Sequence, residues 1–142
     1  MLGLDQIILR LLFGTILSGV IGLEREFKHK PAGLRTNILV GVGSTLVMIV
    51  SQYFEFDPAR IAAGVITGIG FLGAGLIIQD RNEVHGITTA ATIWVVSAVG
   101  LAAGIGMYAA ATATALIALL VLYFFGNDRL RKSIKLPSNK EL

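Results

Sequence analysis

Charged and hydroxyl side chains gather at the ends of apolar stretches in two parts of this sequence. One part is GLEREFKHKPAGLRT, residues 22–36, which holds six charged side chains and a histidine in fifteen positions; the other is QDRNEVHGITT, residues 79–89. Ionisable groups at the edge of a membrane segment are costly unless they are paired, and this makes them candidates for function. The candidate residues are Glu24, Arg25, Glu26, Arg35, Thr36, Asp80, Arg81, His85, Thr88 and Thr89.

These residue types allow two kinds of chemistry. In the first, Arg25 pairs with the carboxylate of Glu26 or Asp80, and the ion pair locks the turns of the chain. In the second, carboxylates hold Mg²⁺, which keeps several waters and is usually bound by one or two carboxylates. Glu24 and Glu26 are two residues apart, about 200° in helical phase, and cannot chelate one ion together. A site would need Glu26 with Asp80 or Glu83, so Mg²⁺ stays an open alternative and no other cofactor is predicted.

The composition indicates a membrane protein. Of 142 residues, 54% are hydrophobic and 15% are charged, and the mean hydropathy is +0.76, whereas soluble domains contain about 45–50% apolar residues. The chain has no cysteine, which excludes disulfides and thiolate metal sites. It offers no soluble pocket for a catalytic triad and no solvated basic face for nucleic acid, so we expect neither an enzyme nor a nucleic-acid-binding protein.

Five hydrophobic runs follow one another with short polar or glycine-bearing connections. A helix needs about 20 apolar residues to cross a bilayer, and the runs have that length. We therefore predict an all-α membrane protein with a transmembrane domain over residues 1–126 and a basic cytoplasmic tail over 127–142. The predicted spans cover residues 7–23, 36–53, 61–78, 87–103 and 107–125.

The basic residues predict the orientation. Loops on the cytoplasmic side of a membrane protein carry an excess of Lys and Arg. Placing the first loop in the cytoplasm puts ten basic residues on that side, Lys28 and Lys30 among them, and leaves two, Arg10 and Arg60, on the other. This predicts an N-out, C-in topology, and an odd number of spans likewise requires the two termini to lie on opposite sides.

Helical phase places small and polar residues on one face of three spans. On the first span, Gly14, Ser18 and Gly22 share a face, and continuing the helix puts Arg25 in the middle of it. We therefore expect Arg25 to point into the bundle. Membrane helices associate through such faces. The corresponding residues are Asn37, Gly41, Ser44 and Ser51 on the second span, and Thr89, Thr92, Ser97, Gly100 and Gly104 on the fourth.

The third span is rich in glycine, with residues Gly64, Gly68, Gly70, Gly73 and Gly75. Each glycine costs roughly 0.5–1 kcal/mol relative to alanine inside a helix. Two expectations remain open: close packing through Gly64 and Gly68, or a broken helix that marks a site of function.

Glycines also break the chain next to two other spans. Gly33 stands before the second span and Gly86 before the fourth. Both are predicted ends of helices.

Four motifs in this order resemble the MgtC/SapB family of bacterial membrane proteins. They are GVIGLERE at 19–26, PAGLRTNILVGVGS at 31–44, ITGIGFLGAGLI at 66–77 and GITTAATIWVVSAVGLAAGIGMY at 86–108. The resemblance implies a multi-pass protein of the bacterial inner membrane that is connected with magnesium homeostasis and, in pathogens, with virulence. Members of that family are described as modulators of membrane ATPases at least as often as transporters, and no enzymatic reaction is established for them.

The resemblance covers the membrane part alone. Many relatives carry a soluble C-terminal domain, whereas residues 127–142 are all that follows the last predicted span here. We expect a homo-oligomer held by glycine-rich faces in the lipid bilayer, acting as a regulator that docks on another membrane protein such as an ATPase. The alternative is a cation transporter or channel with a polar path at the cytoplasmic ends of the first four helices.

Overall fold

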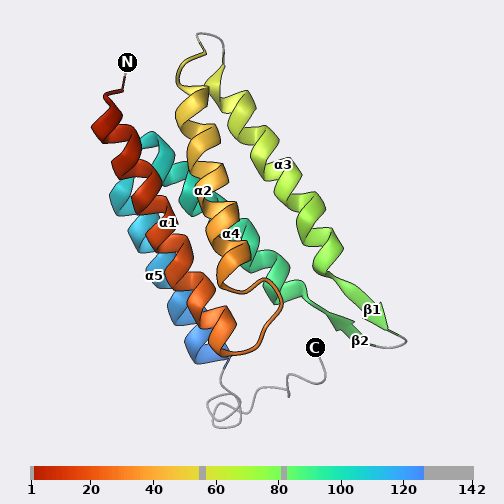
Figure 1. Ribbon diagram of the computed structural model, residues 1–142. Coiled ribbons are helices and arrows are strands. Elements are labelled where there is room, and N and C mark those ends of the chain that lie inside the picture. The colour runs from red at the N-terminus through yellow and green to blue at the C-terminus, as the bar shows by residue number, and fades with distance from the viewer. Residues whose placement is uncertain (1, 55–56, 81–82, 127–142) are drawn as a thin grey trace.

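Five helices form a single bundle in the computed structural model, which describes residues 2–54, 57–80 and 83–126. All five are long and apolar enough to cross a membrane, and successive helices run in opposite directions (Figure 1). This confirms the predicted all-α fold with five spans; the predicted tail 127–142 lies outside the described residues. The helices are α1 Leu4–Phe27, α2 Leu34–Ser51, α3 Pro58–Leu76, α4 Ile87–Ile105 and α5 Tyr108–Phe125.

A β-hairpin connects α3 to α4, where the sequence had indicated the end of the third span and a plain loop. Strands β1 (Ile78–Asp80) and β2 (Glu83–His85) pair antiparallel. The pairing satisfies backbone groups that a loop would leave to water. Gly86 then turns the chain into α4 with φ of +91°, and a Cβ there would lie 2.9 Å from the carbonyl carbon of Leu76. Only glycine fits this turn without strain.

Small residues bring α1, α2 and α4 into close contact. A Cβ added at Gly100 of α4 would lie 2.5 Å from the carbonyl oxygen of Gly41 on α2, and one at Gly104 would lie 2.6 Å from that of Thr45. The predicted small and polar faces are therefore confirmed as the packed faces of the bundle. Their buried residues include Gly14, Ser18, Gly22 and Arg25 on α1, Asn37, Gly41, Ser44 and Ser51 on α2, and Thr89, Thr92, Ser97, Gly100 and Gly104 on α4.

Helix α3 is continuous from Pro58 to Leu76, so the break that the sequence left open is not found. Close packing through Gly64 and Gly68 is not found within the described residues either, because added Cβ atoms there would meet nothing within 4 Å. The same holds for Gly70 and Gly75, whereas Gly73 packs on Ala90 at 3.5 Å. Of the membrane-length window of α3, 11% is buried, against 50% for α4. The helix survives because its backbone hydrogen bonds are internal and have no competitor in lipid.

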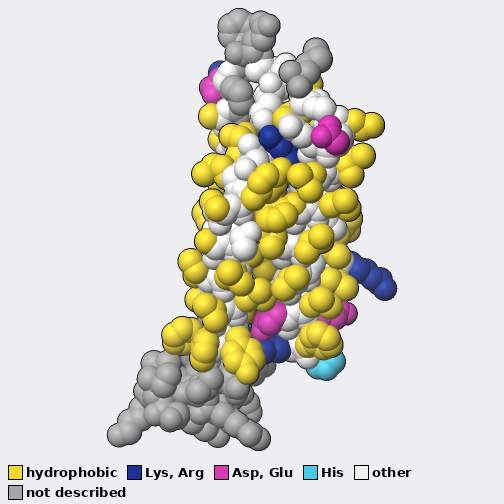
Figure 2. Space-filling view, turned by 90° about the vertical axis from the view of Figure 1, so that its left-hand side faces the viewer, with side chains coloured by type: hydrophobic (Ala, Val, Ile, Leu, Met, Phe, Trp, Pro, Cys, Tyr) yellow, Lys and Arg dark blue, Asp and Glu magenta, His cyan; other side chains and the backbone are white. Residues whose placement is uncertain are grey.

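The outer surface of the bundle is apolar. Large side chains such as Leu12, Phe71 and Leu116 are more than half exposed. Hydrophobic side chains cover the middle of the face in Figure 2, and charged side chains gather toward its two ends. Such a band is the surface that a bilayer requires. We call the lower end in Figure 1 the hairpin end; it holds the end of α1, the start of α2, the hairpin, the start of α4 and the end of α5.

Candidate functional site

Arg25 lies in the seam between α1 and α4 at the hairpin end. The residue is 4% exposed, and its Nη2 donates a hydrogen bond to Oγ1 of Thr89, 3.2 Å away in the first turn of α4. Thr89 is itself buried. Arg25 therefore points into the bundle, as its helical phase predicted.

Among the described side chains, the carboxylate beside Arg25 is Glu24 and not Glu26, and the side chain of Asp80, the other predicted partner, is not described. Oε2 of Glu24 lies 3.8 Å from Nη1 of Arg25, and Oε1 lies 2.7 Å from Nζ of Lys28. Lys28 also donates to the carbonyl oxygen of Leu122, 2.8 Å away at the end of α5. The Glu24 side chain is 13% exposed, and its ion pair with Lys28 links it indirectly to the end of α5.

Glu26 stabilises the start of α2. Its exposed side chain accepts a hydrogen bond through Oε2 from the backbone N–H of Leu34, at 2.9 Å. Gly33 precedes Leu34 as the N-cap residue of α2 and lies against the same carboxylate. An acidic group near a helix N-terminus is favourable because it satisfies a free N–H and the helix dipole.

The structure brings together only part of the predicted cluster. Glu24, Arg25 and Thr89 meet in the seam, and His85 and Thr88 line a cavity beside it. Arg35 and Thr36 are exposed on the first turn of α2. The remaining two are Asp80, whose backbone ends β1 and whose side chain is not among those described, and Arg81, which lies outside the described residues.

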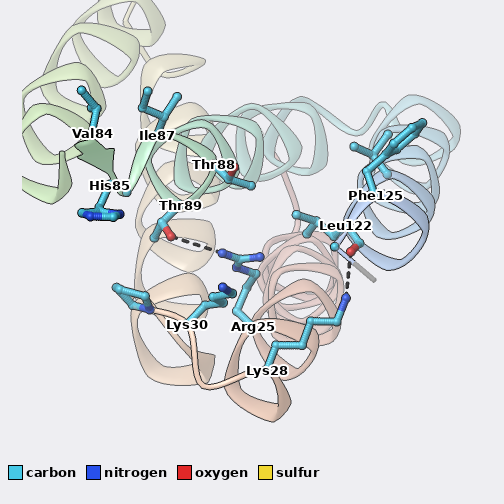
Figure 3. A pocket seen from close by; sticks show the side chains of 14 residues that line it. Arg25, Lys28, Lys30, Val84, His85, Ile87, Thr88, Thr89, Leu122 and Phe125 are labelled. Atoms are coloured by element: carbon cyan, nitrogen blue, oxygen red, sulfur yellow. Dashed lines mark hydrogen bonds between the residues drawn. The ribbon is translucent and has the colours of Figure 1, made fainter. Parts of the chain in front are cut away.

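The cavity beside Arg25 has a volume of about 570 Å³ and lies between the end of α1, the hairpin, the start of α4 and the end of α5 (Figure 3). Arg25, Lys28 and Lys30 line it, and Leu122 and Phe125 are on its apolar side. Sequence reasoning used the two lysines only to orient the protein. The spacing of Lys28, four residues after Glu24 on the same face of α1, was the signal of an inward role.

The described side chains of the site supply few ligands for a divalent cation. Among the side chains that the structure describes, no group of three His, Asp or Glu lies close enough together to hold a metal ion. The side chains of Asp80 and Glu83, the predicted partners of Glu26 in a Mg²⁺ site, are not among them. Glu26, which the predicted Mg²⁺ site required, faces the start of α2, and the cavity is lined by positive groups.

A second polar contact, at the opposite end of the bundle, was missed by sequence reasoning. Nη1 of Arg10 donates to the carbonyl oxygen of Gly104 at 2.7 Å and to Oε1 of Gln52 at 3.2 Å. Gln52 donates to the same carbonyl at 3.0 Å. A cation at the C-terminal end of a helix is favourable, so this contact ties α1 and α2 to the end of α4. An arginine inside an apolar first span was the available signal.

Five membrane-length helices with an apolar outer surface and charged groups at both ends define a multi-pass helical membrane protein. Comparison with known proteins identifies the family within this class. A profile described as the MgtC family matches residues 11–129, and the chain belongs to this family. No solved structure matches it.

Three curated relatives come from different bacteria. The chain is 45% identical to "Putative magnesium transporter YhiD" of Escherichia coli strain K12, over 84% of this chain and 60% of the relative. It is 41% identical to "Protein SapB" of Bacillus subtilis strain 168, over 89% and 62%. It is 48% identical to "Protein MgtC" of Brucella abortus strain 2308, over 72% and 44%. The chain thus spans about half to three-fifths of the length of these relatives.

Proposed function

We propose that this protein serves magnesium homeostasis in the bacterial inner membrane as a regulator, through contacts of its helices with another membrane protein and without catalysing a reaction. Family membership and the printed name of the YhiD relative support the connection with magnesium. The N-out, C-in orientation is part of the proposal and rests on the distribution of Lys and Arg.

The close contact of α2 with α4 carries the preference for a regulator over a conductor. A single carbon atom at Gly100 would already collide with the carbonyl oxygen of Gly41, so this seam has no room for a hydrated ion. The hydroxyl groups of Thr45 and Thr92 donate to carbonyls of their own helices.

Arg25 adds an electrostatic barrier at the hairpin end. Two unit charges about 4 Å apart repel by about 4 kcal/mol at an effective dielectric constant of about 20, and a divalent ion doubles this. A cation that left the bundle near the buried guanidinium would meet this repulsion.

Two helices offer faces for partners. The membrane-length windows of α3 and α5 are 11% and 17% buried, the lowest values of the five. The glycines of α3 allow close approach of a second copy of the chain, and we assign homo-oligomerisation to this helix. The apolar face of α5 is then left for a different membrane protein, such as an ATPase.

Reconstitution tests the proposal. The purified chain is placed in liposomes that contain a magnesium-sensitive dye, and Mg²⁺ entry is compared with protein-free liposomes and with liposomes that hold a known magnesium channel. We expect entry at the protein-free rate. In parallel, the chain should restore growth in low magnesium to a strain that lacks its own family member. Growth without flux supports the regulator, and failure to restore growth contradicts the role in magnesium homeostasis.

A cation conductor, with its path at the hairpin ends of α1 to α4, is the second candidate. The observation that favours it is a pair of buried oxygen atoms, Oγ of Ser18 and Oδ1 of Asn37, for which the described residues provide no hydrogen-bond donor. Oxygen atoms are the ligands that Mg²⁺ prefers. Flux above the protein-free rate that is lost in Glu26→Gln or Arg25→Ala would establish this candidate and overturn the regulator.

A further inference from the structure

The cavity at the hairpin end carries a charge pattern that goes beyond the barrier assigned to Arg25 above. Three basic side chains line it, Arg25, Lys28 and Lys30, and no acidic side chain is among its described lining residues. Glu24 contacts two of these cations from outside the lining. The cavity therefore keeps an excess of positive charge, which attracts anions into a concave site with partly apolar walls.

The N-terminus of α4 opens into the same cavity. Residues 85–89 all line it, and Gly86, the N-cap residue, provides no side-chain hydrogen bond to the first turn. The first N–H groups of a helix have no partner within the helix. Together with the helix dipole, they make the N-terminus of α4, a helix of 19 residues, a favourable place for an anion.

The guanidinium of Arg25 provides an independent sign that a ligand belongs here. The residue is 4% exposed, yet Nε is buried and has no acceptor among the described residues. Its side chain has one recorded hydrogen bond, to Thr89, although a guanidinium carries five N–H donors. Buried donors are normally satisfied. In Figure 3 this incompletely bonded group points into the cavity, between the start of α4 and the lysines.

We propose that this cavity binds the phosphate group of an anionic ligand. The phosphate oxygens accept hydrogen bonds from Arg25, from Lys30 and from the first N–H groups of α4. Arg and Lys are the usual partners of phosphate in proteins, Arg because its planar fork matches two oxygens at once. Of the proposed function, only the orientation enters the choice of ligand, since a regulator and a conductor could both hold an anion here.

The apolar wall of the cavity helps to identify the kind of molecule that carries the phosphate group. Val121, Leu122 and Phe125 of α5 form its apolar side, and the exposed side chains of this part of α5 belong to the apolar outer surface. Basic pockets between membrane helices on the cytoplasmic side bind the headgroups of anionic lipids. A phospholipid headgroup and free inorganic phosphate share the same recognition chemistry, and the experiment separates them.

The lipid arm uses the full chain and a matched pair of variants. Lys30→Gln removes an exposed positive charge from the cavity wall, and Arg35→Gln removes one from the exposed surface of the same end, outside the cavity. Each protein is reconstituted in nanodiscs of phosphatidylcholine with one-fifth phosphatidylglycerol, and bound lipid is counted by native mass spectrometry. We expect enrichment of phosphatidylglycerol that falls about fivefold in Lys30→Gln, the effect of roughly one basic side chain near an anionic lipid, and stays unchanged in Arg35→Gln.

The second arm titrates the chain with inorganic phosphate in neutral detergent and follows the amide signals of Thr88 and Thr89 by NMR. Shifts that saturate in the wild type and weaken in Lys30→Gln, with sulfate as a competitor and high salt as a screen, support a site for the free anion. Lipid enrichment without phosphate binding supports the headgroup as the ligand. The proposal is overturned if neither probe binds, or if Arg35→Gln loses as much binding as Lys30→Gln.

Discussion

At the scale of single residues, the central feature is the buried guanidinium of Arg25. It lies beside Glu24, whereas the sequence suggested Glu26 or Asp80 as its partner. Phase alone put Arg25 inside the bundle, and it is there. Glu24 and Glu26 flank Arg25 at equal angles, about 100° to either side on a helix. Other groups distinguish them: Glu24 pairs with Lys28, which donates to Leu122 of α5, and Glu26 accepts from the N–H of Leu34 at the start of α2.

Thr89→Val tests the contact between α1 and α4 with almost no change of volume. The hydroxyl acceptor of Arg25 is lost, so we expect the free energy of unfolding to fall by about 0.6 kcal/mol, typical between membrane helices, up to about 3 kcal/mol, typical for a charged donor. Unfolding in mixed micelles followed by circular dichroism measures it. Thr88→Val, one residue away and exposed, is the control, and equal losses in the two variants would contradict the role of Thr89.

At the scale of elements, glycines have different structural roles in different helices. In α4, Gly100 and Gly104 permit contact with the backbone of α2, and before α4, Gly86 permits a positive φ. In α3, a Cβ added at four of the five glycines would meet no described atom within 4 Å. The glycine content of α3 suggested that this helix packs closely, but the close contact that Gly100 and Gly104 reveal is between α2 and α4.

Gly100→Ala compared with Gly43→Ala tests this difference. The first adds a carbon atom against the carbonyl oxygen of Gly41, and the second adds one where nothing lies within 4 Å. We expect Gly100→Ala to lower the free energy of unfolding by about 1–3 kcal/mol, the usual effect of overpacking. Gly43→Ala should leave it unchanged or raise it by up to about 1 kcal/mol through helix propensity. A harmless Gly100→Ala would mean that α2 and α4 are further apart than described.

At the scale of the whole molecule, the bundle is asymmetric. Helices α1, α2 and α4 share a packed interior, whereas α3 contacts α4 and α2 along one side (Figure 1). Its opposite side presents Gly64, Gly68 and the 81%-exposed Phe71. In lipid, burial of apolar surface does not drive association, so backbone approach and packing decide which faces meet.

Gly68→Ile tests self-association through α3. A β-branched side chain at this open position keeps the fold and prevents close approach of a second helix. We expect the dimer fraction, measured by cross-linking in nanodiscs, to fall, and a loss of about 1.4 kcal/mol would lower the association constant tenfold. Gly43→Ile, also open in the single chain, is the control. If only Gly43→Ile loses the dimer, the interface between two copies lies on α2 and not on α3.

The absence of cysteine from the sequence makes the orientation simple to test. Arg35→Cys marks the hairpin end and Met107→Cys the opposite end, and both positions are exposed. If the hairpin end is cytoplasmic, a membrane-impermeant maleimide should label Met107→Cys in intact spheroplasts and Arg35→Cys only after lysis. The reverse pattern would contradict the N-out, C-in topology.

The five helices, their polar faces and the inward position of Arg25 could be predicted from the sequence alone, because they depend on periodicity, hydropathy and helix phase, which are local properties. The sequence also carried the family motifs. Only the folded structure showed that Lys28 bonds to the end of α5, and that Lys28 and Lys30 share a cavity with the start of α4 and the end of α5. These features join residues up to about a hundred positions apart, as Lys28 and Leu122 are, and no local pattern specifies which distant backbone will cover a given side chain.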